Sequence, residues 1–112
     1  MYADRLLPHD PESEEAVIGS LLIDGDALTN VTSFLKTSDF YVAKNRWCYE
    51  SCLALFERNE PIDQVSIAHE LSQRERLEEV GGSAYLSHLV TSVPTSVHIE
   101  HYARVVQRAS IM

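Results

Sequence analysis

Two adjacent glycines, Gly81 and Gly82, interrupt the last third of this 112-residue chain and constrain its fold more than any other feature. A charged segment leads into the pair, and the short apolar segment that follows ends at Pro94. Glycine adopts backbone conformations that end helices, and proline cannot continue one, so these residues separate helices. A further helix is expected from Thr95 onward. The pattern indicates helices joined by tight turns and contains no catalytic motif.

The first helix carries a clear start signal. Asp10 offers a side-chain cap, and Pro11 occupies the first helical position, where its missing N–H costs no hydrogen bond. Asp24-Gly25-Asp26 predicts the end of this helix, with Gly25 in a left-handed conformation and Asp26 as the cap of a second helix. Between these limits the apolar residues recur at the three- and four-residue spacing of a buried helix face: Val17, Ile18, Leu21 and Leu22.

Similar spacing along the rest of the chain predicts an all-α fold, a compact bundle of about six helices in a single domain. The later helices are expected over 44–58, 66–74 and 83–93 and from residue 95 onward, and Asn59 is expected to end the third helix in a left-handed conformation. No segment alternates with the period of a strand. The residues predicted to face the core are Leu28, Val31, Phe34 and Leu35 on the second helix and Cys48, Tyr49, Cys52, Leu55 and Phe56 on the third.

The charge balance argues against direct nucleic-acid binding. Seventeen acidic residues face nine lysines and arginines, giving a net charge of −8, and an acidic surface repels phosphate. Arg104 and Arg108, one turn apart, still allow a local basic patch. No apolar run reaches membrane length, residues 1–7 lack a signal-peptide core, and the two cysteines fit a reducing compartment. We therefore expect a cytoplasmic protein with no membrane partner.

The chain lacks the motifs of common catalytic sites. None of its four glycines precedes a lysine, as a phosphate-binding P-loop requires. His69-Glu70 begins a zinc-protease pattern, but Gln73 stands where the second histidine belongs. We therefore expect no catalytic residue, cofactor or metal in this chain.

Two pairs of metal-ligating side chains nevertheless stand one turn apart. Cys48 and Cys52 could offer thiolates to a metal, but their place on the apolar face of the third helix favours small buried side chains. His98 and His101 have suitable spacing, but no third ligand is near them in the sequence, which favours an exposed pair. A small metal protein or enzyme is the weakest hypothesis for the chain.

Aromatic and acidic residues off the core faces are candidates for partner contacts. Trp47 points roughly 150° away from the apolar face of its helix, so it lies either at an interface or beneath the Phe40-Tyr41 connector. Tyr85 lies at the edge of its helix face, where a half-buried ring with a wet hydroxyl suits a bundle edge or a partner. The acidic run 12–15 could form a docking surface, although compensation of the helix dipole is the commoner reason for such a run.

A family resemblance rests on groups of residues that follow one another along the chain: Leu7–Gly19, Asp39–Tyr41, Pro61–Asp63 with Leu71, Leu77–Gly82 with Tyr85 and Leu86, and Ser92–Thr95 with Ile99, Glu100, Tyr102, Ala103, Val105 and Val106. In this order and spacing they resemble the N-terminal domain of replicative DNA helicases of the DnaB type. The residues that depart from the usual family pattern are Ser13, Asn45, Asn59, His98 and His101.

The resemblance implies a non-catalytic part of a larger machine. In this family the segment is a helical head followed by a helical hairpin, and the hairpins pair so that three pairs form one tier of a hexameric ring. The tier stacks on the ATPase ring and helps to dock primase. Residues 1–94 would then be the head and residues 95–112 the truncated first arm of the hairpin. The ATP-dependent helicase motor, with ATP and Mg and most contacts to single-stranded DNA, would lie beyond Met112.

The same resemblance implies where contacts with other subunits, with primase or with a helicase loader would lie. The leading alternative is a stand-alone acidic helical adaptor for another protein, and the reading frame downstream of residue 112 distinguishes the two. The candidate contact residues are Glu12, Trp47, Tyr85, Tyr102, Val105 and Met112.

Overall fold

The computed structural model describes residues 10–111, and side chains through residue 110. All regular structure in this range is helical, which confirms the all-α prediction. No helix in the range is long and apolar enough to cross a lipid bilayer. The elements are α2 (Pro11–Ile23), η1 (Gly25–Asn30), η2 (Thr37–Asp39), α3 (Ala43–Glu57), α4 (Gln64–Gln73), α5 (Leu77–Val80), α6 (Gly82–Thr91) and α7 (Ile99–Ile111), where η denotes a 3-10 helix.

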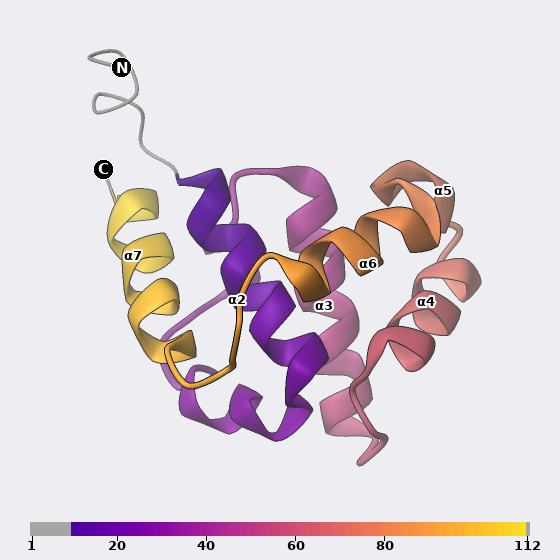
Figure 1. Ribbon diagram of the computed structural model, residues 1–112, viewed down its shortest axis with the longest axis horizontal. Coiled ribbons are helices and arrows are strands. Elements are labelled where there is room, and N and C mark those ends of the chain that lie inside the picture. Colours follow the sequence, from indigo (N-terminus) through magenta and orange to yellow (C-terminus); the bar gives the residue numbers. More distant parts are fainter. Residues whose placement is uncertain (1–9, 112) are drawn as a thin grey trace.

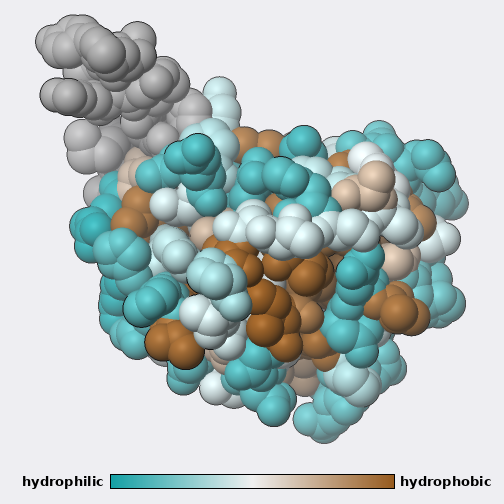
Figure 2. All heavy atoms as spheres, viewed as in Figure 1, coloured by the Kyte–Doolittle hydropathy of each residue, from teal (hydrophilic) through white to brown (hydrophobic). Residues whose placement is uncertain are grey.

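Helix α2 runs through the middle of the bundle (Figure 1) and packs against α3, α6, α7 and η1. Val17, Ile18 and Leu21 of α2 are fully buried. Gly19 lies where α6 crosses α2, so closely that an added Cβ would collide with the carbonyl oxygen of Leu89. Hydrophobic atoms also reach the surface near the middle of the face in Figure 2, with hydrophilic side chains around them.

The start of α2 is as predicted, but its end is not. Asp10 Oδ1 accepts a hydrogen bond from Ser13 N at 3.1 Å, as expected for a cap. At the other end Asp24 is extended, and its carboxylate accepts from Asp26 N at 3.1 Å, so Asp24, not Asp26, caps the next helix. The prediction of a left-handed Gly25 is also wrong, since only Gly81 and Gly82 have positive φ among the described glycines.

The second predicted helix is a six-residue 3-10 helix, η1, followed by turns. Its apolar residues still face the core, with Leu28, Val31 and Leu35 buried and Phe34 half-buried. On α3 the predicted apolar face is confirmed except at Phe56, which is 41% exposed. Asn59 ends this region with φ 59°, as predicted.

The glycine pair forms a tight junction between two helices. Gly81 has φ 109° and Gly82 φ 69°, and together they connect α5 to α6. α6 ends at Thr91, and α7 begins at Ile99, four residues later than predicted from Thr95. The reason is the loop 92–98, where Pro94 prevents helix continuation and Thr95 Oγ1 accepts from Val97 N at 3.2 Å. α7 then packs along α2 and η2.

Candidate functional site

A buried carboxylate ties the start of α2 to the start of α3. Glu14 is 1% exposed and accepts hydrogen bonds from Tyr41 N at 2.7 Å, Val42 N at 3.2 Å and Asn45 Nδ2 at 3.1 Å. Val42, the cap residue of α3, receives no cap from a side chain of its own turn. Glu14 therefore supplies, from another helix, an acceptor for the two backbone N–H groups that precede α3 and for the Asn45 amide in its first turn.

Tyr85 extends this polar cluster toward the surface. Its hydroxyl donates a hydrogen bond to Asn45 Oδ1. The hydroxyl therefore points inward, whereas the sequence had predicted a solvent-exposed hydroxyl. Lys44 Nζ lies 4.2 Å from the centre of the Tyr85 ring, and the His88 ring stacks on it with centroids 6.0 Å apart. Burial is the largest cause of the raised pKa of Tyr85, followed by the charge of Glu15. The Tyr85 hydroxyl is therefore engaged within the protein, and the exposed part of this half-buried side chain lies on its ring.

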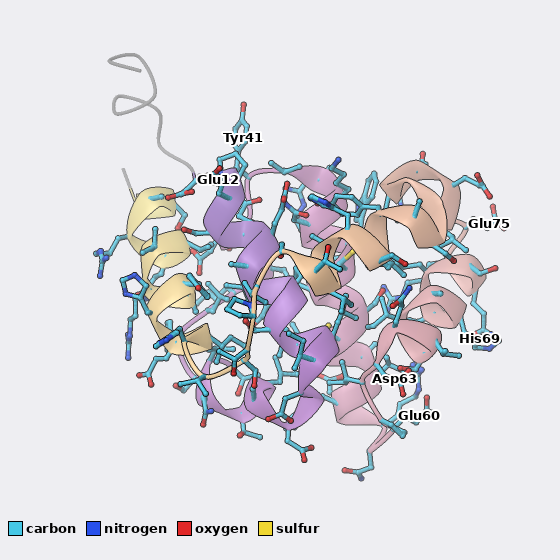
Figure 3. The ribbon with its side chains drawn as sticks, viewed as in Figure 1. Glu12, Tyr41, Glu60, Asp63, His69 and Glu75 are labelled. Atoms are coloured by element: carbon cyan, nitrogen blue, oxygen red, sulfur yellow. The ribbon has the colours of Figure 1, made fainter. Side chains whose placement is uncertain are left out.

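A surface pocket of about 470 Å³ lies between the start of α2, the end of α6 and α7; we call it the α2–α7 pocket. It brings together Glu12 and Tyr102, two of the predicted contact residues, although 90 positions separate them in the chain. Glu12 lies at the α2 end that faces α7 in Figure 3. His88 connects the pocket to Tyr85, because its Nε2 lies 3.3 Å from Glu15 Oε1 while its ring stacks on Tyr85. The lining residues are Asp10, Glu12, Ser13, Glu15, Ala16, His88, Ser92, Val93 and Tyr102.

The other predicted contact residues do not join this pocket. Trp47 is half-buried on α3 and packs against the core, with the Arg76 guanidinium 4.3 Å from its ring centre. Its predicted place at an interface stays a prediction. Val105 is half-buried on α7. Met112 lies outside the described residues. Three of the candidates, Glu12, Tyr85 and Tyr102, thus lie in or next to one surface region.

The two cysteines occupy the core, as expected for small apolar side chains. Cys48 and Cys52 are free thiols with no exposed surface. Burial raises the pKa of Cys48 to about 12 and raises that of Cys52 further. The described residues contain no cluster of three or more metal-ligating side chains. His98 and His101 are exposed, as predicted.

Two side chains of α7 attach this helix to the segment between α2 and α3 through contacts that the sequence analysis did not predict. The Arg104 guanidinium lies 3.6 Å from the centre of the Phe34 ring, and Ser110 Oγ donates to Asp39 Oδ1 at 2.6 Å. Arg104 also lies 3.7 Å from Glu100. Arg104 of the predicted Arg104–Arg108 basic patch is therefore engaged by Phe34 and Glu100, and α7 is tied to the η1–η2 region.

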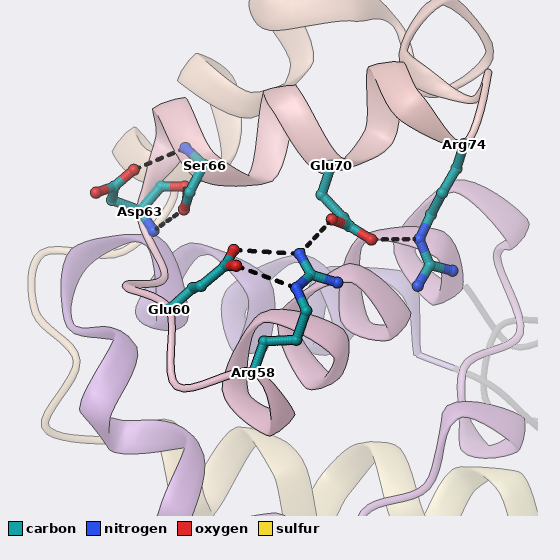
Figure 4. Close-up of polar contacts among 6 residues, drawn as sticks. All are labelled: Arg58, Glu60, Asp63, Ser66, Glu70 and Arg74. Carbon is teal, nitrogen blue, oxygen red and sulfur yellow. Dashed lines mark hydrogen bonds and ion pairs between the residues drawn. The ribbon is translucent and has the colours of Figure 1, made fainter.

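A charge cluster joins the end of α3 to α4 (Figure 4). Arg58 lies 3.2 Å from Glu60 and 2.7 Å from Glu70, and Arg74 lies 2.8 Å from the other oxygen of Glu70. Hydrogen bonds from Arg58, then from Arg74, lower the pKa of the Glu70 carboxyl. The four-residue spacing of Glu70 and Arg74 on one helix predicts this ion pair from the sequence alone. The contact of Arg58 with Glu70 depends on the fold.

Comparisons with known proteins agree with this architecture. The family model described as DnaB-like helicase N terminal domain matches residues 6–108. The chain is 38% identical to replicative DNA helicase DnaB of Geobacillus stearothermophilus over all 112 of its residues, and 41% identical to replicative DNA helicase DnaC of Bacillus subtilis over 109 residues. It spans only about a quarter of these relatives, 25% and 24% of their lengths.

A solved structure gives the same result for the fold. The N-terminal domain of DnaB helicase from Mycobacterium tuberculosis superposes with a TM-score of 0.91 at 35% sequence identity. The match covers 94% of this chain and 73% of that one. The chain belongs to the family of DnaB-like helicase N-terminal domains.

Proposed function

We propose that this chain is the non-catalytic N-terminal scaffold of a hexameric replicative DNA helicase, and that it links subunits and docks primase during DNA replication. The observation that carries the proposal is the family match over residues 6–108 together with the TM-score of 0.91. Relatives named replicative DNA helicases are about four times longer than the segment that they share with this chain. The ATP- and Mg-dependent motor, and most contacts with single-stranded DNA, would belong to the remaining length in the cytoplasmic protein.

The α2–α7 pocket is the surface best suited to primase. It combines an exposed carboxylate, Glu12, with the half-buried ring of Tyr102, and the Tyr85–His88 stack adjoins it. Half-buried aromatic rings beside charged groups are typical anchors of protein interfaces. The buried Glu14–Asn45 contact beneath Tyr85 keeps this surface rigid, which lowers the entropy cost of docking.

Helix α7 is proposed as the first arm of the hairpin and as part of the subunit interface, with residues 1–94 as the head. Its buried face already packs on the head through Ile99, Ala103 and Val106. Val105 lies beside that face and is half-buried, so part of its side chain is available to a neighbouring subunit. We also propose Met112 as a contact residue, because the hairpin arm would continue past it. The surface formed by several paired hairpins would be the place where a helicase loader binds.

The test is the assembly of the complete protein. Val105→Asp is expected to reduce the hexamer fraction in light scattering, because a buried charge without a partner opposes an apolar interface. Val97→Asp, at a position that is 76% exposed before α7, is the matched control and should leave the hexamer intact. An unchanged hexamer in Val105→Asp, with circular dichroism showing a folded head, would count against α7 as the interface.

Primase docking is tested separately with purified primase. Glu12→Lys and Tyr102→Ala are expected to weaken binding of the complete helicase to primase by about tenfold or more if they lie at the centre of the contact. Glu78→Lys, at an exposed position on α5, makes the same charge change elsewhere. Equal effects of Glu12→Lys and Glu78→Lys would place primase elsewhere on the molecule.

A further inference from the structure

A second hollow lies at the far end of α2, away from the α2–α7 pocket. Its volume is about 400 Å³, and it lies where the chain leaves α2 and where α3 runs into α4. The length of α2 separates the two hollows by about 20 Å. We call it the Phe56 hollow, and its lining residues are Gly25, Asp26, Phe56, Asn59, Glu60, Pro61 and Ile62.

The Phe56 hollow presents apolar surface to water. Phe56 is 41% exposed, and Pro61 and Ile62 line the hollow with it. Ile23, two residues before Gly25, is 42% exposed at the end of α2. Large apolar side chains exposed singly are ordinary, but several beside a concave site mark a place where another apolar group gains by burial.

The walls of the Phe56 hollow are held by local backbone features. An added Cβ at Gly25 would lie 2.6 Å from Ile62 Cβ, so only glycine permits this close approach of the two walls. Asn59 turns the chain with φ 59°. Asp63 then caps α4, accepting from Ser66 N at 2.8 Å while Ser66 Oγ accepts from Asp63 N at 2.9 Å (Figure 4). A site with fixed walls loses little conformational freedom when it binds.

The charge around the Phe56 hollow has one sign. Of its lining residues Asp26 and Glu60 are acidic and none is basic. Arg58, next to the hollow in sequence, pairs with Glu60 at 3.2 Å and with Glu70 at 2.7 Å, so it compensates part of the Glu60 charge and leaves Asp26 as the lining carboxylate outside this charge cluster. Glu60 and Asp63 lie together at this end of the molecule in Figure 3, far from Glu12. An apolar hollow with an acidic rim complements an apolar side chain flanked by positive charges.

We propose that the Phe56 hollow is a docking site for a segment of a partner protein that inserts one large apolar side chain flanked by lysine or arginine. This goes beyond the proposed function, because the site lies at the opposite end of α2 from the surface assigned to primase. Copies of the chain are proposed to assemble through α7, but a second copy is a poor occupant of the Phe56 hollow itself, because its net charge of −8 does not complement the acidic rim.

The experiment measures fluorescence anisotropy of a labelled peptide with the complete protein. The probe has a central leucine–phenylalanine pair with two lysines on each side. One control peptide replaces the central pair with alanines, and another replaces the lysines with glutamates. We expect binding of the first peptide alone, weakened by added salt because the rim contributes by charge.

Variants of the protein locate the binding. Phe56→Ala is expected to weaken binding of the probe peptide by about fivefold or more, because it removes a central apolar contact. Asp26→Lys, a surface change that leaves the core intact, is expected to weaken it by about threefold or more. The matched controls are Val97→Ala, which truncates an exposed apolar side chain outside the hollow, and Glu78→Lys, which makes the same kind of charge change on α5; both should bind the probe as the unchanged protein does.

Three results would overturn the proposal. The first is equal binding of the alanine-centred or glutamate-flanked peptide. The second is unchanged binding in both Phe56→Ala and Asp26→Lys. The third is self-association of the complete protein that Asp26→Lys changes, which would make a second copy the occupant.

Discussion

The carboxylate of Glu14 on α2 accepts a hydrogen bond from the side-chain amide of Asn45 on α3 at 3.1 Å, and both residues are fully buried. The side-chain oxygen of Asn45, Oδ1, accepts a hydrogen bond from the Tyr85 hydroxyl on α6. These hydrogen bonds form one network that fixes the relative positions of three helices. Because a buried polar group without a partner is costly, the loss of one side chain from the network destabilises the hydrogen-bonding groups that remain.

Glu14→Ala is expected to lower the free energy of unfolding by about 2–4 kcal/mol, because two backbone N–H groups and the Asn45 amide lose a charged acceptor. Urea denaturation followed by circular dichroism measures this change. Glu15→Ala is the control one position along, where the side chain is 28% exposed and lies 3.3 Å from His88. It should cost less than about 1 kcal/mol. Similar losses in the two variants would show that the Glu14 contacts do not stabilise the fold.

Removal of the Arg76 side chain should change the surroundings of Trp47. The guanidinium covers the indole at 4.3 Å, and Arg76 also pairs with Glu79 at 2.8 Å. Arg76→Ala is expected to shift the tryptophan emission to the red as water reaches the ring, and to cost about 0.5–1 kcal/mol of stability. Trp47 is the chain's one tryptophan, so the signal is unambiguous. Arg108→Ala on α7 is the control, and an equal shift there would contradict the stacking.

Sequence reasoning located most helices because their start signals and apolar spacing are local. The Asp10 cap, the left-handed Asn59 and the glycine pair each act within one turn of chain. Some wrong predictions had local causes, such as the Asp24 cap and the Thr95 contact that delays α7, and others depended on a partner distant in the sequence. Gly25 is needed for its close approach to Ile62, a contact that a left-handed cap does not require.

The candidate site was less predictable for the same reason. Glu14 was read as part of an acidic run at a helix start, but the fold buries it against α3. Trp47 was assigned by helix angle alone, and Arg76, which covers it, comes 29 positions later. The family resemblance supplied Glu12 and Tyr102 as separate candidates, and only the packing of α7 on α2 brings them to one pocket.

The buried thiols should react only when the chain opens. Burial raises the pKa of Cys48 to about 12, so at pH 8 almost none of it is the reactive thiolate. A disulfide reagent such as dithionitrobenzoate is expected to label the native chain slowly and to label two thiols at once in urea. The control is glutathione at the same concentration. Fast labelling of the native chain would contradict the burial of Cys48 and Cys52.

The ion pairs of Glu70 should make the free energy of unfolding depend on pH in the acid range. Arg58 and Arg74 lower the pKa of Glu70 in the folded chain, below the value of about 4.3 for an unperturbed glutamate. A carboxyl with a lowered folded pKa binds its proton more readily when unfolded, so its contribution is fully present above about pH 5. The contribution is lost as the pH falls through the folded pKa.

Glu70→Gln is therefore expected to cost about 1–3 kcal/mol at pH 7, the scale of hydrogen bonds to a charged group, and progressively less as the pH falls below 4. Urea unfolding at several pH values measures the difference from the unchanged chain. Glu79→Gln is the control, because its pair with Arg76 is 54% exposed on the acid side and contributes little at any pH. Since Arg58 and Arg74 keep their charge throughout, a loss that stays constant from pH 7 to pH 3 would show that Glu70 acts by its shape and not by its ionised carboxylate.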